Sequence, residues 1–201
     1  MLTIGVTGGT GCGKTAFLRR IEARGGEVVD CDALYYDLLR TDGALRAALT
    51  DAFGAVFLPD GSLDRKALGA RVFSDEKQLE RLNRIVFFHV CRAVREIQSR
   101  ASTAGCTLFA VDAINLMESG LAALCSVTVA VLAPEPVRLR RIMARDGIDE
   151  RYAAMRIHAQ KPDAFYREHC RYILENGEIS PEEFSIHANQ LIDQIVKENQ
   201  P

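Results

Sequence analysis

The stretch IGVTGGTGCGKTAF, residues 4–17, contains four closely spaced glycines that are interrupted only by Thr10 and Cys12. Glycine loses more conformational freedom on folding than any other residue, so such a cluster suits a backbone that turns sharply or approaches another group closely. Residues 8–15, GGTGCGKT, fit the pattern G-x-x-x-x-G-K-[ST] at every position. An apolar run typical of a buried parallel strand, residues 2–6, precedes the motif, and a helical pattern follows it.

This pattern is typical of a loop that binds phosphate. Successive backbone N–H groups surround the phosphate, and the positive end of the helix dipole adds to the attraction. Lys14 is expected to reach the β- and γ-phosphate oxygens, and the hydroxyl of Thr15 to bind Mg²⁺. The predicted nucleotide-binding residues are Gly9, Thr10, Gly11, Cys12, Gly13, Lys14, Thr15 and Ala16. The alternative is a glycine-rich turn with an incidental lysine, but the strand before the motif and the helix after it favour phosphate binding.

Composition predicts one folded domain that does not bind polyanions. The chain has 201 residues, of which 48% are hydrophobic and 26% charged, and its net charge is -2. Such a charge gives no general attraction for DNA or RNA, so no nucleic-acid partner is expected. The six cysteines lack a C-x-x-C pair, which favours reduced cytosolic thiols. Neither a signal peptide nor a membrane span is expected, so we predict a cytoplasmic protein that is a monomer or a weak homo-oligomer.

Alternating strand and helix patterns predict an α/β fold, a single domain over residues 1–201, with a P-loop NTPase-like sheet of about five parallel strands. Strands are expected at LTIGV (2–6), EVVDCD (27–32), CTLFAVDA (106–113), SVTVAVLAP (126–134) and CRYILEN (170–176). Residues 33–100 show amphipathic helices that are broken by a turn at 58–64. A long helical stretch is expected from about 136 to 168, and Ser180 followed by Pro181 predicts a terminal helix.

Two acidic residues, Asp30 and Asp32, end the second predicted strand. Ligands bind at the carboxyl ends of strands in open α/β sheets. A carboxylate beside the γ-phosphate accepts the proton of an attacking hydroxyl or helps to hold Mg²⁺ through water. The alternative for Asp32 is to cap the helix expected from Ala33. We favour a functional role for Asp32, and both roles stay open for Asp30.

Two further acidic residues follow the strand predicted at 106–113. Asp112 is a candidate Walker B acid that holds the water shell of the metal, although an acidic residue at this position also simply ends a strand. Glu118, a few residues further on, is a second candidate for a functional carboxylate.

Three arginines share one face of the helix predicted near residue 136. Arg138, Arg141 and Arg145 fall within an arc of about 60° at 100° per residue. Guanidinium groups on one stripe are able to close over a triphosphate as a lid, and the alternative is a solvated face. We predict that Arg141 or Arg145 contacts the triphosphate and that residues 138–168 form the lid region.

A phosphate-binding loop is common to switch GTPases, motor ATPases and small-molecule kinases. The chain has no N-K-x-D string for guanine recognition, and it is too acidic and too short for a nucleic-acid motor. These absences from the sequence favour a kinase.

Over nearly its whole length, the chain resembles the dephospho-coenzyme A kinase family. Besides the phosphate-binding loop, the blocks that carry the resemblance are VVDCD (28–32), DGSLDRKALGARVF (60–73), LERLNRIVFFH (79–89), DAINLMESGL (112–121), RRIMARD (140–146), RIHAQ (156–160) and ILENG (173–177). The resemblance implies transfer of a phosphoryl group from ATP to the ribose 3′-hydroxyl of dephospho-CoA, with Mg²⁺ as the metal. It also implies a helical CoA-side subdomain over residues 33–100.

The resemblance assigns roles to single residues. Asp32 is the implied general base and catalytic residue, with Lys14, Arg141 and Arg145 as the other catalytic residues. Arg65 and His89, with Asp32, are the implied contacts of the acceptor, and Thr15 is the implied contact of the metal. From their positions after the predicted strand, we add Glu118 as an acceptor contact and Asp112 as a metal contact.

The chain departs from the family pattern on the acceptor side. Val90 follows His89 where the family usually has proline, and the other departures are Ile114, Asn115, Leu116, His169 and Cys170. Two alternatives therefore stay open: a nucleoside or nucleotide kinase, and a nucleotide-binding paralogue without catalytic activity.

Overall fold

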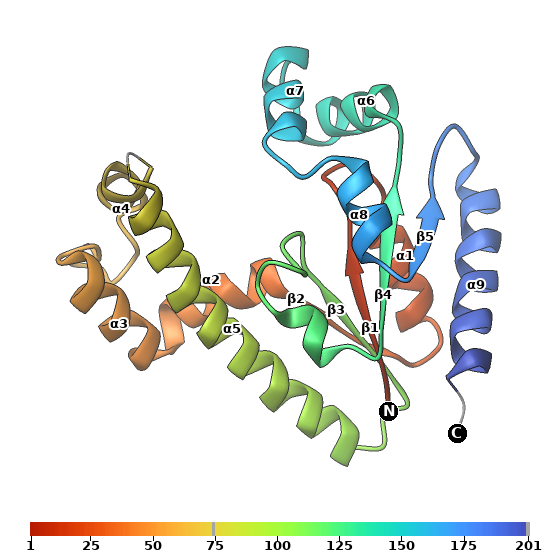
Figure 1. The fold of residues 1–201 in the computed structure, drawn as a ribbon, viewed down its shortest axis with the longest axis horizontal. Coiled ribbons are helices and arrows are strands. Elements are labelled where there is room, and N and C mark those ends of the chain that lie inside the picture. Colours follow the sequence, from red (N-terminus) through yellow and green to blue (C-terminus); the bar gives the residue numbers. More distant parts are fainter. Residues whose placement is uncertain (74, 200–201) are drawn as a thin grey trace. The chain divides into compact units, whose positions relative to one another are not determined.

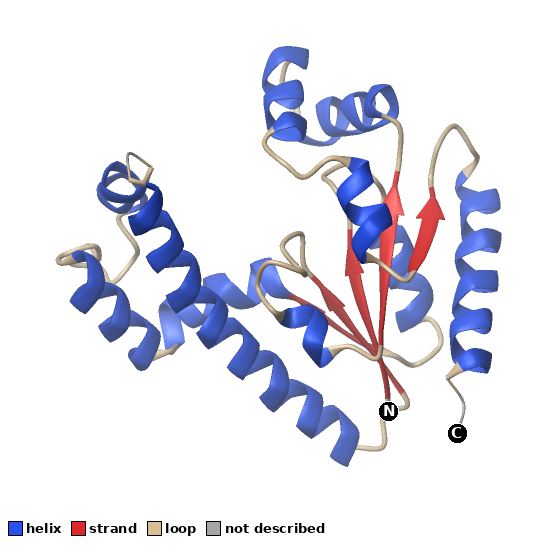
Figure 2. Cartoon of the chain, viewed as in Figure 1, coloured by secondary structure: helices blue, strands red, loops and turns tan. Residues whose placement is uncertain are grey.

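The computed structural model describes residues 1–73 and 75–199 and has an α/β architecture (Figures 1 and 2). Its strands are β1 (Leu2–Thr7), β2 (Glu27–Asp30), β3 (Leu108–Asp112), β4 (Val127–Leu132) and β5 (Tyr172–Glu175). They form one sheet in the order β2-β3-β1-β4-β5. Strand β1 pairs in parallel with β3 and β4, and β4 pairs in parallel with β5. The prediction of a parallel sheet of about five strands is thus confirmed.

Both faces of the three central strands, β1, β3 and β4, are buried, as their continuous apolar runs predicted. On β4, Val129 and Val131 join the cluster that includes α1 and α9, whereas Ala130 and Leu132 face the opposite cluster, around Tyr166. Side chains alternate between the two faces of a strand, so a strand with both faces covered is apolar at every position. The result is a three-layer arrangement.

The chain divides into two compact units, which we call the sheet unit and the helical unit. The sheet unit is Met1–Val29 with Gln98–Pro201, and the helical unit is Asp30–Ile97. The helical unit contains α2 (Cys31–Thr41), α3 (Gly43–Phe53), α4 (Arg65–Val72) and most of α5 (Glu76–Thr103). Its core includes Leu45, Leu49 and Val56, which are fully buried.

The turn predicted at 58–64 is confirmed in the helical unit. Phe57 and Leu63 form an antiparallel bridge across it, and the Leu58 N–H donates to the Ser62 carbonyl at 2.8 Å. Gly61 has a φ of +84°, a conformation that favours glycine.

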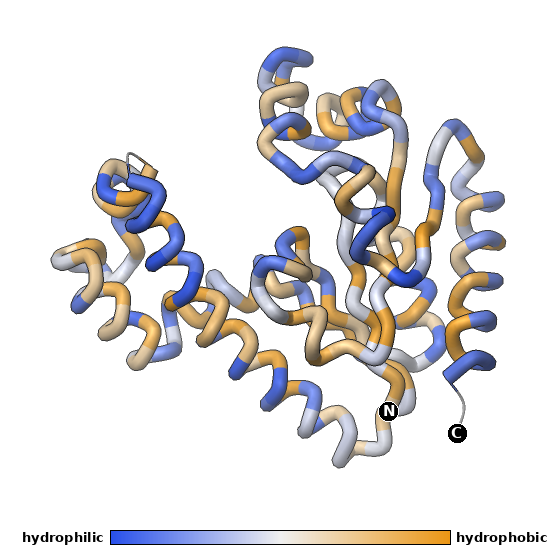
Figure 3. Tube along the Cα trace, viewed as in Figure 1, coloured by the Kyte–Doolittle hydropathy of each residue, from blue (hydrophilic) through white to orange (hydrophobic). Residues whose placement is uncertain are grey.

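The sheet unit contains α1 (Lys14–Glu22), a short 3-10 helix η1 (Leu121–Leu124), α6 (Glu135–Asp146), α7 (Glu150–His158), α8 (Asp163–His169) and α9 (Pro181–Glu198). The helical stretch predicted from 136 to 168 is thus three helices, because Gly147 at a φ of +65° ends α6 and Pro162 precedes α8. The predicted start of α9 is confirmed, since Ser180 and Glu183 form a capping box. Hydrophobic and hydrophilic residues alternate along α9 (Figure 3), whose apolar face packs on the sheet.

None of the helices in the described part of the chain combines the length and the apolar content that a bilayer crossing requires.

The second strand is shorter than predicted. It ends at Asp30, and α2 begins at Cys31, so Asp30 and Asp32 do not lie on one strand face. The side chain of Asp30 accepts hydrogen bonds from the N–H groups of Asp32 at 2.9 Å and Ala33 at 3.0 Å. Asp30 is therefore the N-cap of α2, and the capping role considered for Asp32 belongs to Asp30.

Candidate functional site

The glycine-rich loop connects β1 to α1 at the carboxyl end of the central strand. Strand β1 lies between β3 and β4, where the connections of the sheet change direction. Such a switch point is where open α/β sheets bind ligands. Gly8, Gly11 and Gly13 have φ values of +129°, +78° and +100°, which other residues rarely adopt. The predicted order of strand, loop and helix is confirmed, with the loop turned by its glycines.

Close approach of other groups also requires these glycines. A Cβ atom built on Gly8 lies 2.1 Å from the backbone oxygen of Val131 in β4. A Cβ on Gly13 lies 2.1 Å from the side-chain nitrogen of Asn176. The loop therefore has no room for side chains at these positions.

Lys14 and the first turn of α1 continue the loop. The Lys14 ammonium donates to the Gly8 carbonyl at 2.9 Å, which holds the charge against the start of the loop. Thr15 and Ala16 are exposed at the N-terminus of the helix, where the Ala16 N–H donates to the Gly13 carbonyl at 3.0 Å. Cys12 is buried, and burial raises the pKa of its thiol although Lys14 and Arg138 oppose the shift. The loop thus offers backbone and a lysine, and not a thiolate, to a ligand.

Asp112 and Glu118 follow β3, the neighbour of β1. Asp112 is the last residue of β3, is half-buried and pairs in register with Val6. The Thr7 hydroxyl donates to the Ile114 carbonyl at 3.0 Å, which ties the end of β1 to the segment after β3. Glu118 is exposed. Burial raises the pKa of Tyr166 to about 12, and the Glu118 carboxylate contributes to that shift.

The three arginines of α6 have different surroundings. Arg138 is 5% exposed and donates to the Thr10 carbonyl at 2.9 Å. Arg141 is half-buried against residues 11, 176 and 177, and burial lowers its pKa. Arg145 lies on the surface, where hydrogen bonds to Asp146 raise its pKa. The triphosphate contacts predicted for Arg141 and Arg145 stay predictions.

Asp32 lies in the first turn of α2 with an exposed side chain. Its predicted role as the general base is compatible with this exposure, since a base must reach the acceptor hydroxyl. The role stays a prediction.

Three of the predicted acceptor contacts, Asp32, Arg65 and His89, lie in the helical unit. His89 is 5% exposed, and its Nδ1 atom lies 2.9 Å from the Asp42 carboxylate, which also accepts from Arg92 at 2.6 Å. Arg65 is exposed, with its guanidinium 4.9 Å from the centre of the Tyr36 ring. In this structure His89 is buried beside the Asp42 carboxylate, and Arg65 is the more accessible of the two.

Arg65 also borders two hollows of the helical unit. One, of about 220 Å³, is lined mainly by apolar residues such as Leu68, Val72 and Leu82, and the other, of about 560 Å³, includes Asp37. Arg65 is therefore a lining residue that the two hollows share.

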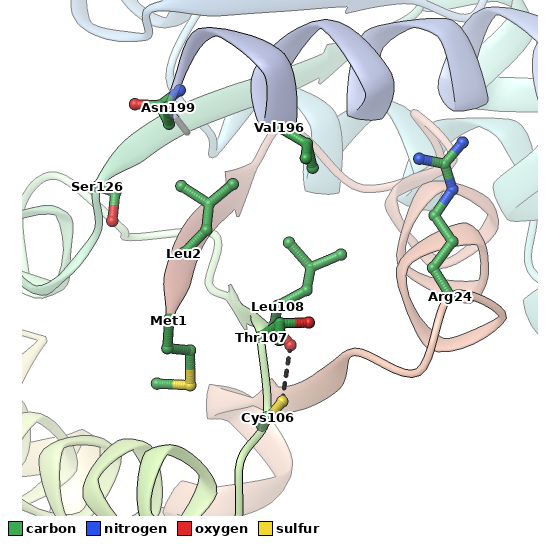
Figure 4. A pocket seen from close by; sticks show the side chains of 9 residues that line it. All are labelled: Met1, Leu2, Arg24, Cys106, Thr107, Leu108, Ser126, Val196 and Asn199. Carbon is green, nitrogen blue, oxygen red and sulfur yellow. Dashed lines mark hydrogen bonds between the residues drawn. The ribbon is translucent and has the colours of Figure 1, made fainter. Parts of the chain in front are cut away.

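A further hollow lies at the amino ends of the strands. It has a volume of about 730 Å³, and Leu2, Leu108 and Val196 line it (Figure 4). The Cys106 thiol donates to the Leu108 carbonyl at 3.0 Å there. Leu2 and the glycine-rich loop lie at opposite ends of β1, so this hollow is separate from the predicted nucleotide site.

Two residues that touch the glycine-rich loop had no predicted role. Gln160, just after α7, accepts a hydrogen bond from the Thr10 N–H at 2.9 Å. Asn176, just after β5, is buried and donates to the Cys12 carbonyl at 2.8 Å. Both residues lie in sequence blocks that carry the family resemblance, at 156–160 and 173–177, and this was the only signal for them.

Three of the six departures from the family pattern lie in the core. Val90, Leu116 and Cys170 are all buried, and Leu116 packs where a Cβ on Gly5 would stand. Val90 lies within α5, where a proline would remove a backbone hydrogen bond. These three changes therefore alter packing.

The sheet order and the glycine-rich loop between β1 and α1 define a P-loop fold. Shikimate kinase from Acinetobacter baumannii has a similar fold, with a TM-score of 0.55 at 16% identity over 100% of this chain and 96% of that one. A dephospho-CoA kinase from Campylobacter jejuni is closer in fold, with a TM-score of 0.69 at 21% identity and 98% coverage of both chains.

Sequence comparison identifies the family. The family model for dephospho-CoA kinase matches residues 2–181. A dephospho-CoA kinase from Anaeromyxobacter dehalogenans is 39% identical over 193 residues, which are 96% of this chain and 91% of the relative. One from Salinibacter ruber is 36% identical over 88% of this chain and 89% of the relative. The chain belongs to the dephospho-CoA kinase family.

Proposed function

We propose that the chain phosphorylates the ribose 3′-hydroxyl of dephospho-CoA with ATP, which gives CoA and ADP, the last step of coenzyme A synthesis. Family membership supports the activity, because curated relatives that align over nearly the whole chain are named dephospho-CoA kinase. The observation that carries the proposal is the loop of residues 8–15, with its left-handed glycines and its lysine, at the carboxyl end of the central strand.

The loop binds the triphosphate of ATP in this proposal. The N–H groups of the loop and of the first turn of α1 surround the β-phosphate, and the helix dipole adds positive potential. Lys14 leaves the Gly8 carbonyl for the β- and γ-phosphate oxygens. Arg141 and Arg145 on α6 supply further positive charge from the lid region, residues 138–168.

Thr15 and Asp112 fit Mg²⁺. A hydroxyl and a carboxylate are hard oxygen ligands, and in nucleotide sites Mg²⁺ uses one or two protein ligands together with phosphates and waters. Thr15 is exposed at the start of α1, and Asp112 ends the strand beside β1. The metal neutralises charge on the phosphates when it is bound.

Asp32 takes the proton of the 3′-hydroxyl as this oxygen attacks the γ-phosphorus, and ADP leaves in line with the attack. Most of the lowering of the barrier comes from positioning and from charge stabilisation, because phosphoryl transfer needs little covalent chemistry from the protein. Arg65, His89 and Glu118 contribute to the acceptor site. The helices of residues 33–100 form the CoA-side subdomain, and the enzyme works in the cytoplasm as a monomer or weak homo-oligomer without nucleic acid.

A coupled assay of ADP release tests the proposal. The purified chain is given ATP and Mg²⁺ with dephospho-CoA, with nucleosides, with nucleoside monophosphates or without an acceptor. ADP release that requires dephospho-CoA supports the proposal. Release with nucleosides or their monophosphates alone replaces it by a nucleoside or nucleotide kinase. ATP binding by calorimetry without ADP release from any acceptor replaces it by a non-catalytic paralogue.

A further inference from the structure

We propose that Arg138, Gln160 and Asn176 are positioning residues that hold the phosphate-binding loop in the conformation that presents its N–H groups to phosphate. The inference deepens the proposed function, since it concerns the same site and rests on that function for the identity of the ligand. Arg138 begins the lid region, Gln160 follows α7, and Asn176 follows β5. Residues far apart in the chain thus converge on one loop.

Three consecutive carbonyl groups of the loop accept hydrogen bonds from side chains. Arg138 Nε donates to the Thr10 carbonyl at 2.9 Å, and Asn176 Nδ2 donates to the Cys12 carbonyl at 2.8 Å. Between them, Arg141 Nη1 donates to the Gly11 carbonyl at 3.4 Å. The hydrogen bonds from Arg138 and Asn176 are short, whereas the one from Arg141 is long. We therefore infer that Arg138 and Asn176 hold the loop.

The direction of these carbonyls sets the direction of the N–H groups. In a planar trans peptide, the N–H of a residue points opposite to the carbonyl of the residue before it. Because Arg138 holds the Thr10 carbonyl, the Gly11 N–H points away from Arg138. Because Asn176 holds the Cys12 carbonyl, the Gly13 N–H points away from Asn176. Gly11 and Gly13 are two of the left-handed glycines of the loop, and N–H groups aimed to one side form an anion-binding nest.

Gln160 completes the arrangement on the other side of Thr10. Its Oε1 atom accepts from the Thr10 N–H at 2.9 Å and from Arg138 Nη2 at 2.8 Å. Arg138 and Gln160 thus engage both the carbonyl and the N–H of Thr10, and each fixes the other. The Thr10 N–H is occupied, so the nest begins at Gly11.

Arg138 also brings a buried positive charge to the loop. Its side chain is 6% exposed, and the carboxylate oxygen of Asp163 lies 3.9 Å from Nη1, a distance too long for a hydrogen bond. A buried guanidinium that is poorly neutralised is costly alone and is stabilised by an anion nearby. Arg138 therefore favours phosphate binding in two ways: it holds the loop, and its positive charge attracts the anion.

The side chains also explain two of the glycines. A Cβ on Gly9 lies 2.1 Å from Arg138 Nη2, and one on Gly13 lies 2.1 Å from Asn176 Nδ2. Positions 9 and 13 must stay small for Arg138 and Asn176 to approach the backbone. Part of the glycine motif thus serves contacts within the protein.

The test measures the affinity for inorganic tripolyphosphate and for ATP in matched variants. Gln160→Met removes both acceptor interactions, whereas Gln160→Glu keeps two acceptor oxygens of similar reach. We expect Gln160→Met to weaken tripolyphosphate binding by about tenfold or more, and Gln160→Glu to retain most of the affinity. Arg138→Lys, which keeps a charge but loses the planar fork, is expected to weaken binding as well. Arg171→Gln, whose parent side chain pairs with Glu198 on the surface outside the lid region, is the control.

The same variants separate positioning from simple stability. Urea unfolding without ligand corrects each affinity for the folded fraction, and the amide signals of Gly11 and Gly13 report the loop by NMR. Shifted amide signals with weakened binding in Gln160→Met, restored in Gln160→Glu, support the proposal. If Gln160→Met does not fold, Arg138→Lys carries the same test.

Parent-like affinity in both Gln160→Met and Arg138→Lys, or a loss explained by unfolding alone, overturns the proposal. The readout does not depend on the acceptor. A chain that fails to phosphorylate dephospho-CoA but loses tripolyphosphate affinity in Gln160→Met therefore refutes only the proposed function. Turnover of dephospho-CoA with unchanged affinity in the variants refutes only the positioning roles.

Discussion

Substitution of Gly8 by alanine tests how rigidly the phosphate-binding loop sits on the sheet. Gly8 has a φ of +129°, and an added Cβ would lie 2.1 Å from the backbone oxygen of Val131. The backbone conformation costs a residue with a side chain about 1–2 kcal/mol. The clash adds about 1–3 kcal/mol, because a carbonyl of a central strand cannot rotate away as a side chain does. We expect Gly8→Ala to lower the free energy of unfolding by about 2–5 kcal/mol.

Gly105→Ala is the matched control. Gly105 also has a positive φ, +81°, but no atom lies within 4 Å of an added Cβ. It precedes β3, at the amino end of the sheet, so we expect a loss of only about 1–2 kcal/mol and unchanged ATP affinity. Urea unfolding gives the two stabilities, and calorimetry gives the affinity for ATP. Equal losses of stability in the two variants, with ATP affinity unchanged in both, would refute the reasoning that β4 fixes the loop.

Three further substitutions test separate parts of the site. Asp32→Asn should retain ATP binding and lower kcat by about 100-fold or more, because an amide cannot accept the proton. Full activity in this variant would refute the assignment of Asp32 as the general base. Lys14→Ala should lower kcat/KM by about 100-fold or more, because the positive charge that stabilises the phosphates is lost. Steady-state kinetics measures this ratio, and a value equal to that of the parent would contradict the role of Lys14. Asp42→Asn should cost about 1–3 kcal/mol of stability at neutral pH, because it keeps the N-cap of α3 but loses the charged bonds to His89 and Arg92.

The Asp42 prediction also has a pH dependence. Burial opposes ionisation of Asp42, but hydrogen bonds from His89 and the N–H groups of α3 outweigh it, so its pKa is lowered. A carboxylate whose pKa is lower in the folded protein than in the unfolded chain, where it is about 4, stabilises the folded state at pH values above 4. This stability is lost as the pH falls through the pKa that the group has in the folded protein. Unfolding curves of the parent and Asp42→Asn should therefore converge below about pH 4. A difference that persists undiminished as the pH falls well below about 4 would contradict the assignment.

The sequence contained local signals for the loop, the strands and the caps. The motif at 8–15 depends on backbone conformation, which glycine at fixed positions reveals directly. The end of α6 at Gly147 and the start of α8 after Pro162 also carried local signals, although we predicted one long helical stretch there. Asp32 was considered as the alternative N-cap of α2, two residues after the actual cap, because Asp30 and Asp32 are both suitable caps.

The parts of the site that depend on contacts distant in sequence were not predictable. A helical stripe of three arginines does not show which one is buried, and Arg138 is buried because Thr10 and Gln160 offer it polar partners. Asn176 has no periodic or motif signal of its own, since its role comes from the approach of the end of β5 to Cys12. Such pairings arise from the order of strands in the sheet, which periodicity does not encode.

The most direct measurement is the position of the phosphate in the product. The chain is incubated with ATP, Mg²⁺ and dephospho-CoA, and the purified product is analysed by phosphorus and proton NMR. Coupling of a new monophosphate to the ribose 3′-proton, with one ADP formed for each product molecule, is the predicted result. A phosphate at another oxygen, or ADP without a phosphorylated acceptor, would contradict the account.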